Sequence, residues 1–211
     1  MRKPAVPTTS PRAIRGVRAV AAVAIAALAG GLAACSADPV TEQYLKNDNA
    51  GFIASDFRVK EIPQDERGEP VEWEGVTETG DELSSDDTAG DVTVVNFWYA
   101  ACGPCRAEAA DLESVWQEHQ GDDVSFVGVN TYDQADTARS FAERWGVTYP
   151  SVIDVNDGAV KLAFAGATSI QATPTTLVLD REGRIAAILI GQLEGASVLS
   201  TLVADTLAES A

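Results

Sequence analysis

The sequence predicts an α/β domain in which a mixed β-sheet is flanked by helices, and three observations support this class. Apolar runs rich in β-branched residues, typical of strands buried on both faces, alternate with segments of helical periodicity. Near the end, two apolar runs are joined by a short polar turn, as in an antiparallel hairpin. The 211 residues suffice for one domain with a sizeable core plus extensions at its ends.

The first elements of this domain form an N-terminal β extension. Residues 70–83, PVEWEGVTETGDEL, alternate apolar and polar positions around a Thr-Gly turn and predict a strand or a hairpin. Residues 84–91, SSDDTAGD, predict a loop. Residues 92–98, VTVVNFW, predict a central strand buried on both faces. Residues 103–120 then predict a helix whose apolar stripe is Ala107, Ala110, Leu112, Val115 and Trp116.

The second half of the chain continues the alternation and ends in a hairpin and a helix. A strand is expected at 124–130, and a helix at 134–146 that Gly146 terminates. The remaining expected elements are a short strand and turn at 149–158, a short helix at 159–166, a hairpin at 174–191 and an amphipathic helix at 194–209. This order favours a layered α/β arrangement with a mixed sheet.

Charge is distributed unevenly along the chain. The whole sequence has 15 basic and 32 acidic residues, a formal net charge of −17. The first 34 residues contain five basic residues and no acidic one, so 10 basic and 32 acidic residues remain in the rest. A surface this acidic repels nucleic acid and anionic lipid, which excludes those partners and favours a solvated, soluble face.

The N-terminus has the pattern of an export signal. A basic stretch precedes the apolar run Ala19–Leu32, whose 14 residues are fewer than the ~20 that span a bilayer as a helix. The run ends in LAAC, Leu32 to Cys35, which resembles a bacterial lipobox. The resemblance implies a signal peptide at 1–34, lipid on Cys35 and an extracytoplasmic domain anchored to the cell membrane. The alternative is an ordinary secretory signal with an incidental cysteine.

A polar, aperiodic segment then leads to the folded domain. Residues 35–55 comprise the lipidated cysteine and a flexible tether, and residues 56–211 form the domain. Lipid on Cys35 leaves one cysteine pair, Cys102 and Cys105, separated by Gly103 and Pro104.

The spacing and context of this pair favour redox chemistry. A zinc site needs about four ligands, but the chain offers only this pair and one histidine, His119, which is expected to be solvated at a helix end. A structural disulfide over so short a loop removes little unfolded-state entropy. Cys102 would lie at a helix N-terminus, where the dipole favours an attacking thiolate, with Pro104 in the first turn. Cys105 would lie one turn further in, more buried, and would resolve a mixed disulfide.

Two motifs resemble the thioredoxin superfamily: CGPC after VVNFW, and ATPTTLVLDREGRI at 172–185. The resemblance implies a thioredoxin fold in which Pro174 is cis and faces the cysteine pair, and in which the backbone of Thr173 binds substrate. NFW…CGPCRAE, a helix–strand insertion at 131–158 and the lipobox are most similar to TlpA/ResA-like extracytoplasmic thiol–disulfide proteins.

The resemblance also assigns roles to two residues around the pair, Asn96 and Glu108. Asn96 takes the place of a buried acid, although it is otherwise read as a strand polar group bonded to its neighbours. Glu108 matches a glutamate that accepts the Cys105 proton and tunes the acidity of both thiols, although an exposed helix glutamate is the alternative. Trp98 supports the active site from the strand and is expected in the core.

The predicted function is that of a membrane-anchored reductase with no cofactor beyond the Cys102–Cys105 disulfide, and with no metal. By resemblance, its partners are disulfide-containing exported proteins such as apocytochrome c, and a membrane electron donor of the CcdA/DsbD type. Two alternatives stay open: a disulfide-forming oxidase, and a non-catalytic redox module that handles haem or copper.

Overall fold

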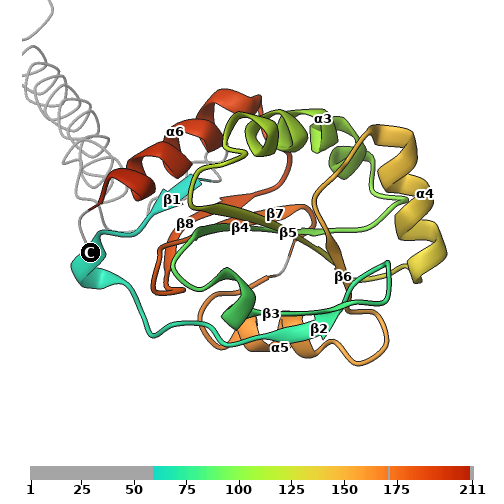
Figure 1. Ribbon diagram of the computed structural model, residues 1–211, viewed down its shortest axis with the longest axis horizontal. Helices are drawn as coiled ribbons and strands as arrows, with labels where there is room; N and C mark the ends of the chain where they lie inside the picture. The colour runs from blue at the N-terminus through green and yellow to red at the C-terminus, as the bar shows by residue number, and fades with distance from the viewer. Residues whose placement is uncertain (1–58, 171, 210–211) are drawn as a thin grey trace, which may run out of the picture. The chain divides into compact units, whose positions relative to one another are not determined.

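The structure, a computed structural model, describes residues 59–170 and 172–209 (Figure 1). These residues belong to the compact unit Ile53–Ala211. The predicted signal peptide, Cys35 and the tether to residue 55 lie outside the described residues. Within the described part, no helix combines the length and the apolar character needed to cross a membrane.

A mixed sheet forms the centre of the domain, as predicted, and it has six strands, including the unpredicted edge strand β1. Its order is β1-β8-β7-β4-β5-β6. The pairs β4–β5 and β5–β6 are parallel, whereas β4–β7, β7–β8 and β1–β8 are antiparallel. The strands are β1 (Val59–Glu61), β4 (Val92–Trp98), β5 (Val124–Asn130), β6 (Ser151–Ile153), β7 (Thr175–Leu179) and β8 (Ile185–Ile190).

Helices cover both faces of this sheet (Figure 1). Alternation along β4 directs Val92 and Val94 toward α3 and α6, and Val95 and Phe97 toward α5. Helix α4 packs beside α3 through Phe141. The predicted insertion is confirmed, since α4 and β6 lie between β5 and α5. The helices are α3 (Gly103–Glu118), α4 (Ala135–Trp145), α5 (Ala159–Ala165) and α6 (Ala196–Ala208).

The N-terminal extension contains a short 3-10 turn, η2 (Gln64–Glu66), and the predicted hairpin. Strands β2 (Glu74–Val76) and β3 (Glu82–Ser84) form a separate two-stranded sheet. The expectation of a loop after it is wrong over η3 (Ser85–Thr88), which is a 3-10 turn. This turn forms because the backbone N–H and hydroxyl of Ser84 both donate to Asp87 Oδ2 across 2.8 Å.

The buried face of α3 differs from the predicted stripe. Ala107 and Ala110 are exposed, and α3 ends at Glu118. The buried residues of α3 are Cys105, Glu108, Ala109, Leu112 and Val115. The expectation for His119 is also wrong: it is buried, and its Nδ1 lies 3.1 Å from Asp122 Oδ2. The termination of α4 is as predicted, since Gly146 adopts a left-handed φ of 73° that favours glycine.

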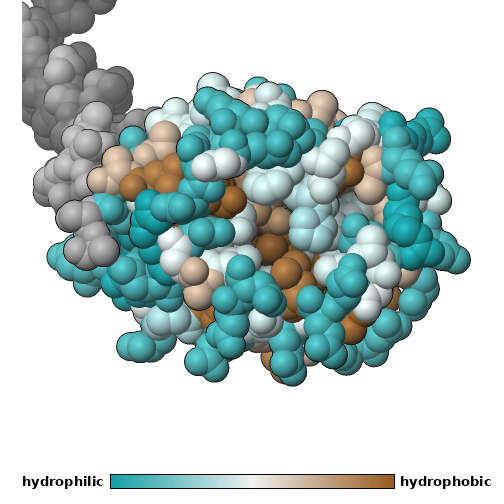
Figure 2. Space-filling model, in the orientation of Figure 1, coloured by the Kyte–Doolittle hydropathy of each residue, from teal (hydrophilic) through white to brown (hydrophobic). Residues whose placement is uncertain are grey.

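The surface agrees with the acidic composition. The face in Figure 2 is mainly hydrophilic, with hydrophobic residues confined to smaller patches. Among the described residues, two large hydrophobic side chains are the most exposed: Tyr132 after β5 and Leu162 on α5, each with 74% of its surface accessible.

Candidate active site

The cysteine pair lies where the central strand passes into a helix. Strand β4 ends at Trp98, and Cys102 is the N-cap of α3. Cys102 and Cys105 form a disulfide, with the exposed Gly103 and Pro104 between them in the first turn. The expectation that Cys105 is the more buried cysteine is wrong, because both are 3% exposed. The two sulfurs therefore differ in their neighbours and not in their burial.

Cys102 has the surroundings that suit an attacking sulfur. Its Sγ accepts the backbone N–H of Cys105 across 3.1 Å, at the positive end of the α3 dipole. A thiolate at this position keeps that hydrogen bond and gains from the dipole, so the helix start stabilises the form of sulfur that attacks a disulfide.

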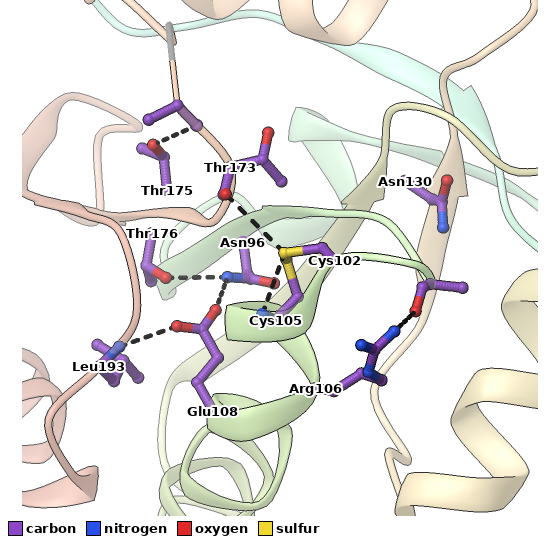
Figure 3. Close-up of a disulfide and its surroundings, with 12 residues drawn as sticks. Asn96, Cys102, Cys105, Arg106, Glu108, Asn130, Thr173, Thr175, Thr176 and Leu193 are labelled. Carbon is purple, nitrogen blue, oxygen red and sulfur yellow. Dashed lines mark hydrogen bonds between the residues drawn. A yellow bond between two sulfur atoms is a disulfide. The ribbon is translucent and has the colours of Figure 1, made fainter.

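The loop before β7 faces Cys102, as predicted. The Thr173–Pro174 peptide bond is cis. The carbonyl oxygen of Thr173 lies 3.9 Å from Cys102 Sγ (Figure 3). Two bonds fix the loop: Thr175 Oγ1 donates to the carbonyl of Ala172 across 2.8 Å, and the Gly191 N–H donates to that of Pro174 across 2.7 Å. Pro174 is buried and Thr173 is partly exposed, so a polypeptide can reach this backbone beside the sulfur.

A buried carboxylate lies under the disulfide, and the alternative of an exposed helix glutamate is wrong. Glu108 is fully buried. Its Oε1 accepts the side-chain amide of Asn96 across 3.0 Å, and its Oε2 accepts the N–H of Leu193 across 2.9 Å (Figure 3). The same Asn96 amide also donates to Thr176 Oγ1 across 3.0 Å. The side-chain amide of Asn96, on β4, therefore links Glu108 of α3 to Thr176 of the neighbouring strand β7.

The electrostatics of Glu108 suit proton exchange. Burial raises the pKa of Glu108 from its ordinary 4.5 to about 7, against the two hydrogen bonds that favour the charged form. A carboxyl with a pKa near 7 gives and takes a proton at neutral pH. A cavity of about 10 Å³, about the size of one water, is lined by Cys105, Asn96 and Tyr149 among others.

Trp98 lies in the core beside the disulfide, as predicted. It is 5% exposed, and its ring centroid is 4.4 Å from that of Phe141. Its Nε1 donates to Ser151 Oγ across 3.2 Å. Gly128 makes this contact possible, because a Cβ there would lie 2.2 Å from Ser151 Oγ.

Sequence reasoning missed the residues that hold the loop before Cys102. The N–H of Ala100 donates to Asp133 Oδ2 across 2.6 Å. Arg106 Nη1 donates to the carbonyl of Ala100 across 3.0 Å, the bond drawn from Arg106 in Figure 3. Asn130 donates to the same Asp133 oxygen across 3.1 Å. The available signal was an asparagine at a strand end with an aspartate three residues later, a pattern typical of side chain-to-backbone turns.

Residues 59–170 and 172–209 contain no group of three or more His, Cys, Asp or Glu side chains that could hold a metal ion.

Comparison with known proteins assigns the chain to a family. The Redoxin family matches residues 51–203, and the chain belongs to that family. Thiol-disulfide oxidoreductase ResA of Geobacillus thermodenitrificans (strain NG80-2) is 30% identical over 107 residues, which are 51% of this chain and 59% of that protein. The predicted similarity to ResA-like proteins is thereby confirmed. The chain spans about three-fifths of the length of the curated relatives it matches.

Solved structures confirm the thioredoxin-like fold. A DsbF homologue from Corynebacterium diphtheriae superposes with a TM-score of 0.63 at 29% identity, covering 74% of this chain and 97% of that one. StoA from Bacillus subtilis superposes with a TM-score of 0.52 at 26% identity, covering 63% of this chain and 96% of that one. The predicted class, a mixed sheet flanked by helices with an N-terminal extension and a central insertion, therefore holds.

Proposed function

We propose that this protein is a thiol–disulfide oxidoreductase that reduces disulfides in exported proteins while anchored to the outer side of the cell membrane. The observation that carries the proposal is the position of Cys102. Its sulfur caps α3, is bonded to Cys105, and faces the Thr173 carbonyl across 3.9 Å. A helix-start sulfur beside a partly exposed backbone suits attack on a polypeptide disulfide.

The reaction consists of two exchanges. In the reduced protein, the Cys102 thiolate attacks one sulfur of the substrate disulfide, which forms a mixed disulfide and releases the other substrate sulfur as a thiolate. Cys105 then attacks Cys102 Sγ, which restores the Cys102–Cys105 disulfide and releases the second substrate sulfur. The substrate disulfide gains two electrons, and its two thiolates take up the proton that Cys105 loses and one proton from solvent, which leaves the protein oxidised.

Glu108 acts as the proton acceptor in the second exchange. Cys105 must lose its proton before it attacks, and Glu108 lies one turn away on the same buried face of α3. Because burial holds the pKa of Glu108 near 7, its ionised form is available at neutral pH to take that proton. Asn96 is a positioning residue that orients the carboxylate.

The Cys102–Cys105 disulfide must be reduced again after each reaction. The described chain carries one cysteine pair, so electrons come from another protein, which we assign to a membrane donor of the CcdA/DsbD type. The substrate that the ResA resemblance favours is apocytochrome c, whose haem-binding cysteines must be reduced. Lipid on Cys35 holds the domain at the membrane where both partners lie.

Cysteine variants test the activity. We expect Cys102→Ser to abolish insulin reduction and to lower cytochrome c content in the producing cell. Cys105→Ser should instead accumulate the mixed disulfide, visible as a thiol-sensitive adduct by mass spectrometry. Ala101→Ser is the matched control, because Ala101 is exposed directly before Cys102. Unchanged insulin reduction and cytochrome c content in Cys102→Ser would overturn the proposal.

The anchor is tested separately. Cys35→Ala should move the protein from the membrane fraction to the soluble extracytoplasmic fraction, with its insulin-reducing activity retained. Continued membrane association of that variant after removal of residues 1–34 would contradict lipid attachment at Cys35.

A further inference from the structure

The sheet topology places a second loop beside Cys102, opposite the Thr173 loop. Strand β4 lies between β7 and β5. Because β7 runs antiparallel to β4 and β5 runs parallel to it, the start of β7 and the end of β5 lie at the same edge as Cys102. Figure 3 shows Thr173 on one side of Cys102 and Asn130, the last residue of β5, on the other. A polypeptide bound along Thr173 therefore meets the loop after Asn130 as it passes the disulfide.

An exposed aromatic pair lies on this loop. Tyr132 is 74% exposed, and its ring centroid lies 5.6 Å from that of Tyr99. Tyr99 packs against the buried cluster that contains Cys102 and Cys105, and its carbonyl accepts the N–H of Cys102 across 3.2 Å. The pair therefore presents apolar surface to solvent next to the cluster that holds the disulfide. Tyrosine rings supply large contact area at low conformational cost when a partner binds.

The loop that carries Tyr132 is held in place before any substrate arrives. Asn130 Oδ1 accepts the N–H groups of Tyr132 and Asp133 across 3.1 and 2.7 Å. Asp133 in turn accepts the Ala100 N–H, and the Thr131 N–H donates to the Trp98 carbonyl across 3.1 Å. These bonds tie the loop to the segment before Cys102. A preorganised surface loses little entropy on binding, which favours a binding role for the exposed ring.

We infer that Tyr132 and Tyr99 form a subsite for an aromatic or large apolar side chain next to the cysteine that Cys102 attacks. The occupant is an unfolded polypeptide, because Thr173 and Asn130 lie on opposite sides of Cys102 and an extended chain can cross the disulfide between their loops. The subsite selects polypeptide disulfides flanked by such residues over those flanked by glycine. This inference rests on the proposed function, since it concerns the substrate of the same disulfide.

The test compares two synthetic peptides, each with one intramolecular disulfide, that differ only in Phe or Gly beside one cysteine. The reduced full-length protein, in detergent, is mixed with each peptide, and the second-order rate constant of reduction is measured. We expect the wild-type protein to favour the Phe peptide by about twofold to tenfold, the range that an aromatic pair supplies. In Tyr132→Ala this ratio should fall to about one, whereas Tyr132→Phe should retain it.

Leu162→Ala is the matched control, because Leu162 is equally exposed but lies on α5, and it should leave the ratio unchanged. A wild-type ratio of about one, or a ratio that survives Tyr132→Ala, would overturn the subsite while leaving the proposed function intact. A wild-type protein that reduces neither peptide would overturn the proposed function, and the subsite with it.

Discussion

Asn96 on β4 and Glu108 on α3 are joined by a hydrogen bond of 3.0 Å in the interior beneath the Cys102–Cys105 disulfide. The bond forms because the side-chain repeat of β4 and that of α3 bring these two residues to the same interface. Asn96 shares the α3-facing side of β4 with Val92 and Val94, and Glu108 shares one face of α3 with Leu112 and Val115. An amide and a carboxylate therefore meet where apolar pairs fill the rest of the interface.

This burial predicts a pH dependence of stability. Because the folded pKa of Glu108 is raised to about 7, the folded protein binds more protons than the unfolded chain between pH 4.5 and 7. The contribution of protonated Glu108 to the free energy of unfolding is fully present below about pH 4.5. It is lost as the pH rises through 7, where the buried carboxyl ionises. Glu108→Gln cannot ionise, so the free energy of unfolding of the wild type should fall relative to this variant across that window.

Chemical denaturation at pH 4.5, 6, 7 and 8 measures this difference. Glu143→Gln is a suitable control, because Glu143 is exposed on α4 and that variant should track the wild type more closely. A constant difference between the wild type and Glu108→Gln across the range would show that Glu108 does not titrate there.

The close packing around Gly128 predicts that one added methyl group lowers the stability of the domain. A Cβ at Gly128 would lie 2.2 Å from Ser151 Oγ and 2.8 Å from Trp98 Nε1, so β5 or the tryptophan must shift. We expect Gly128→Ala to lower the free energy of unfolding by about 1–3 kcal/mol, the usual cost of overpacking a core. Gly68→Ala is the control, because no atom lies within 4 Å of its added methyl. Equal unfolding midpoints for both variants would contradict the close packing around Trp98.

The ion pairs of Arg67 predict that its removal lowers the stability of the domain. Its guanidinium bonds Asp180 across 3.0 Å and both carboxylate oxygens of Glu209 across 2.6 Å, and its side chain is only 3% exposed. Without Arg67, Asp180 keeps only its pair with Arg184, and the partly exposed Glu209 loses its partner. We expect Arg67→Met to lower the free energy of unfolding by about 1–3 kcal/mol in thermal or chemical denaturation.

A surface pair supplies the comparison for Arg67. Arg181 pairs with Asp123, whose side chain is 72% exposed. Arg181→Met should therefore cost less than about 1 kcal/mol. If both variants lost the same small amount, the Arg67 network would not join the N-terminal extension to the end of α6.

Much of the fold was predictable because it depends on local patterns. The β-branched run at 92–98 and the polar turn at 181–184 each predict their element without reference to the rest of the chain. The cis bond before Pro174 came from the family resemblance and not from residue chemistry. The subfamily role of Glu108 came from the same source, although its spacing with Leu112 and Val115 could have indicated burial.

Other features depend on tertiary contacts that no local pattern contains. Asp133 binds Ala100 only because β5 ends beside β4, 33 residues away in the sequence. His119 is a polar residue at a helix end, where exposure is the usual outcome, but the turn that follows it brings Asp122 back to its ring. The aromatic pair of Tyr99 and Tyr132 has the same origin, because two strand ends place the rings together.

The reduction potential of the Cys102–Cys105 pair tests the central claim most directly. The full-length protein, equilibrated in graded thiol buffers, is trapped and the oxidised fraction is measured. A protein that donates electrons to exported substrates should have a potential near that of thioredoxin, about −270 mV or lower. A value near about −120 mV would contradict the account and would make the protein a disulfide-forming oxidase.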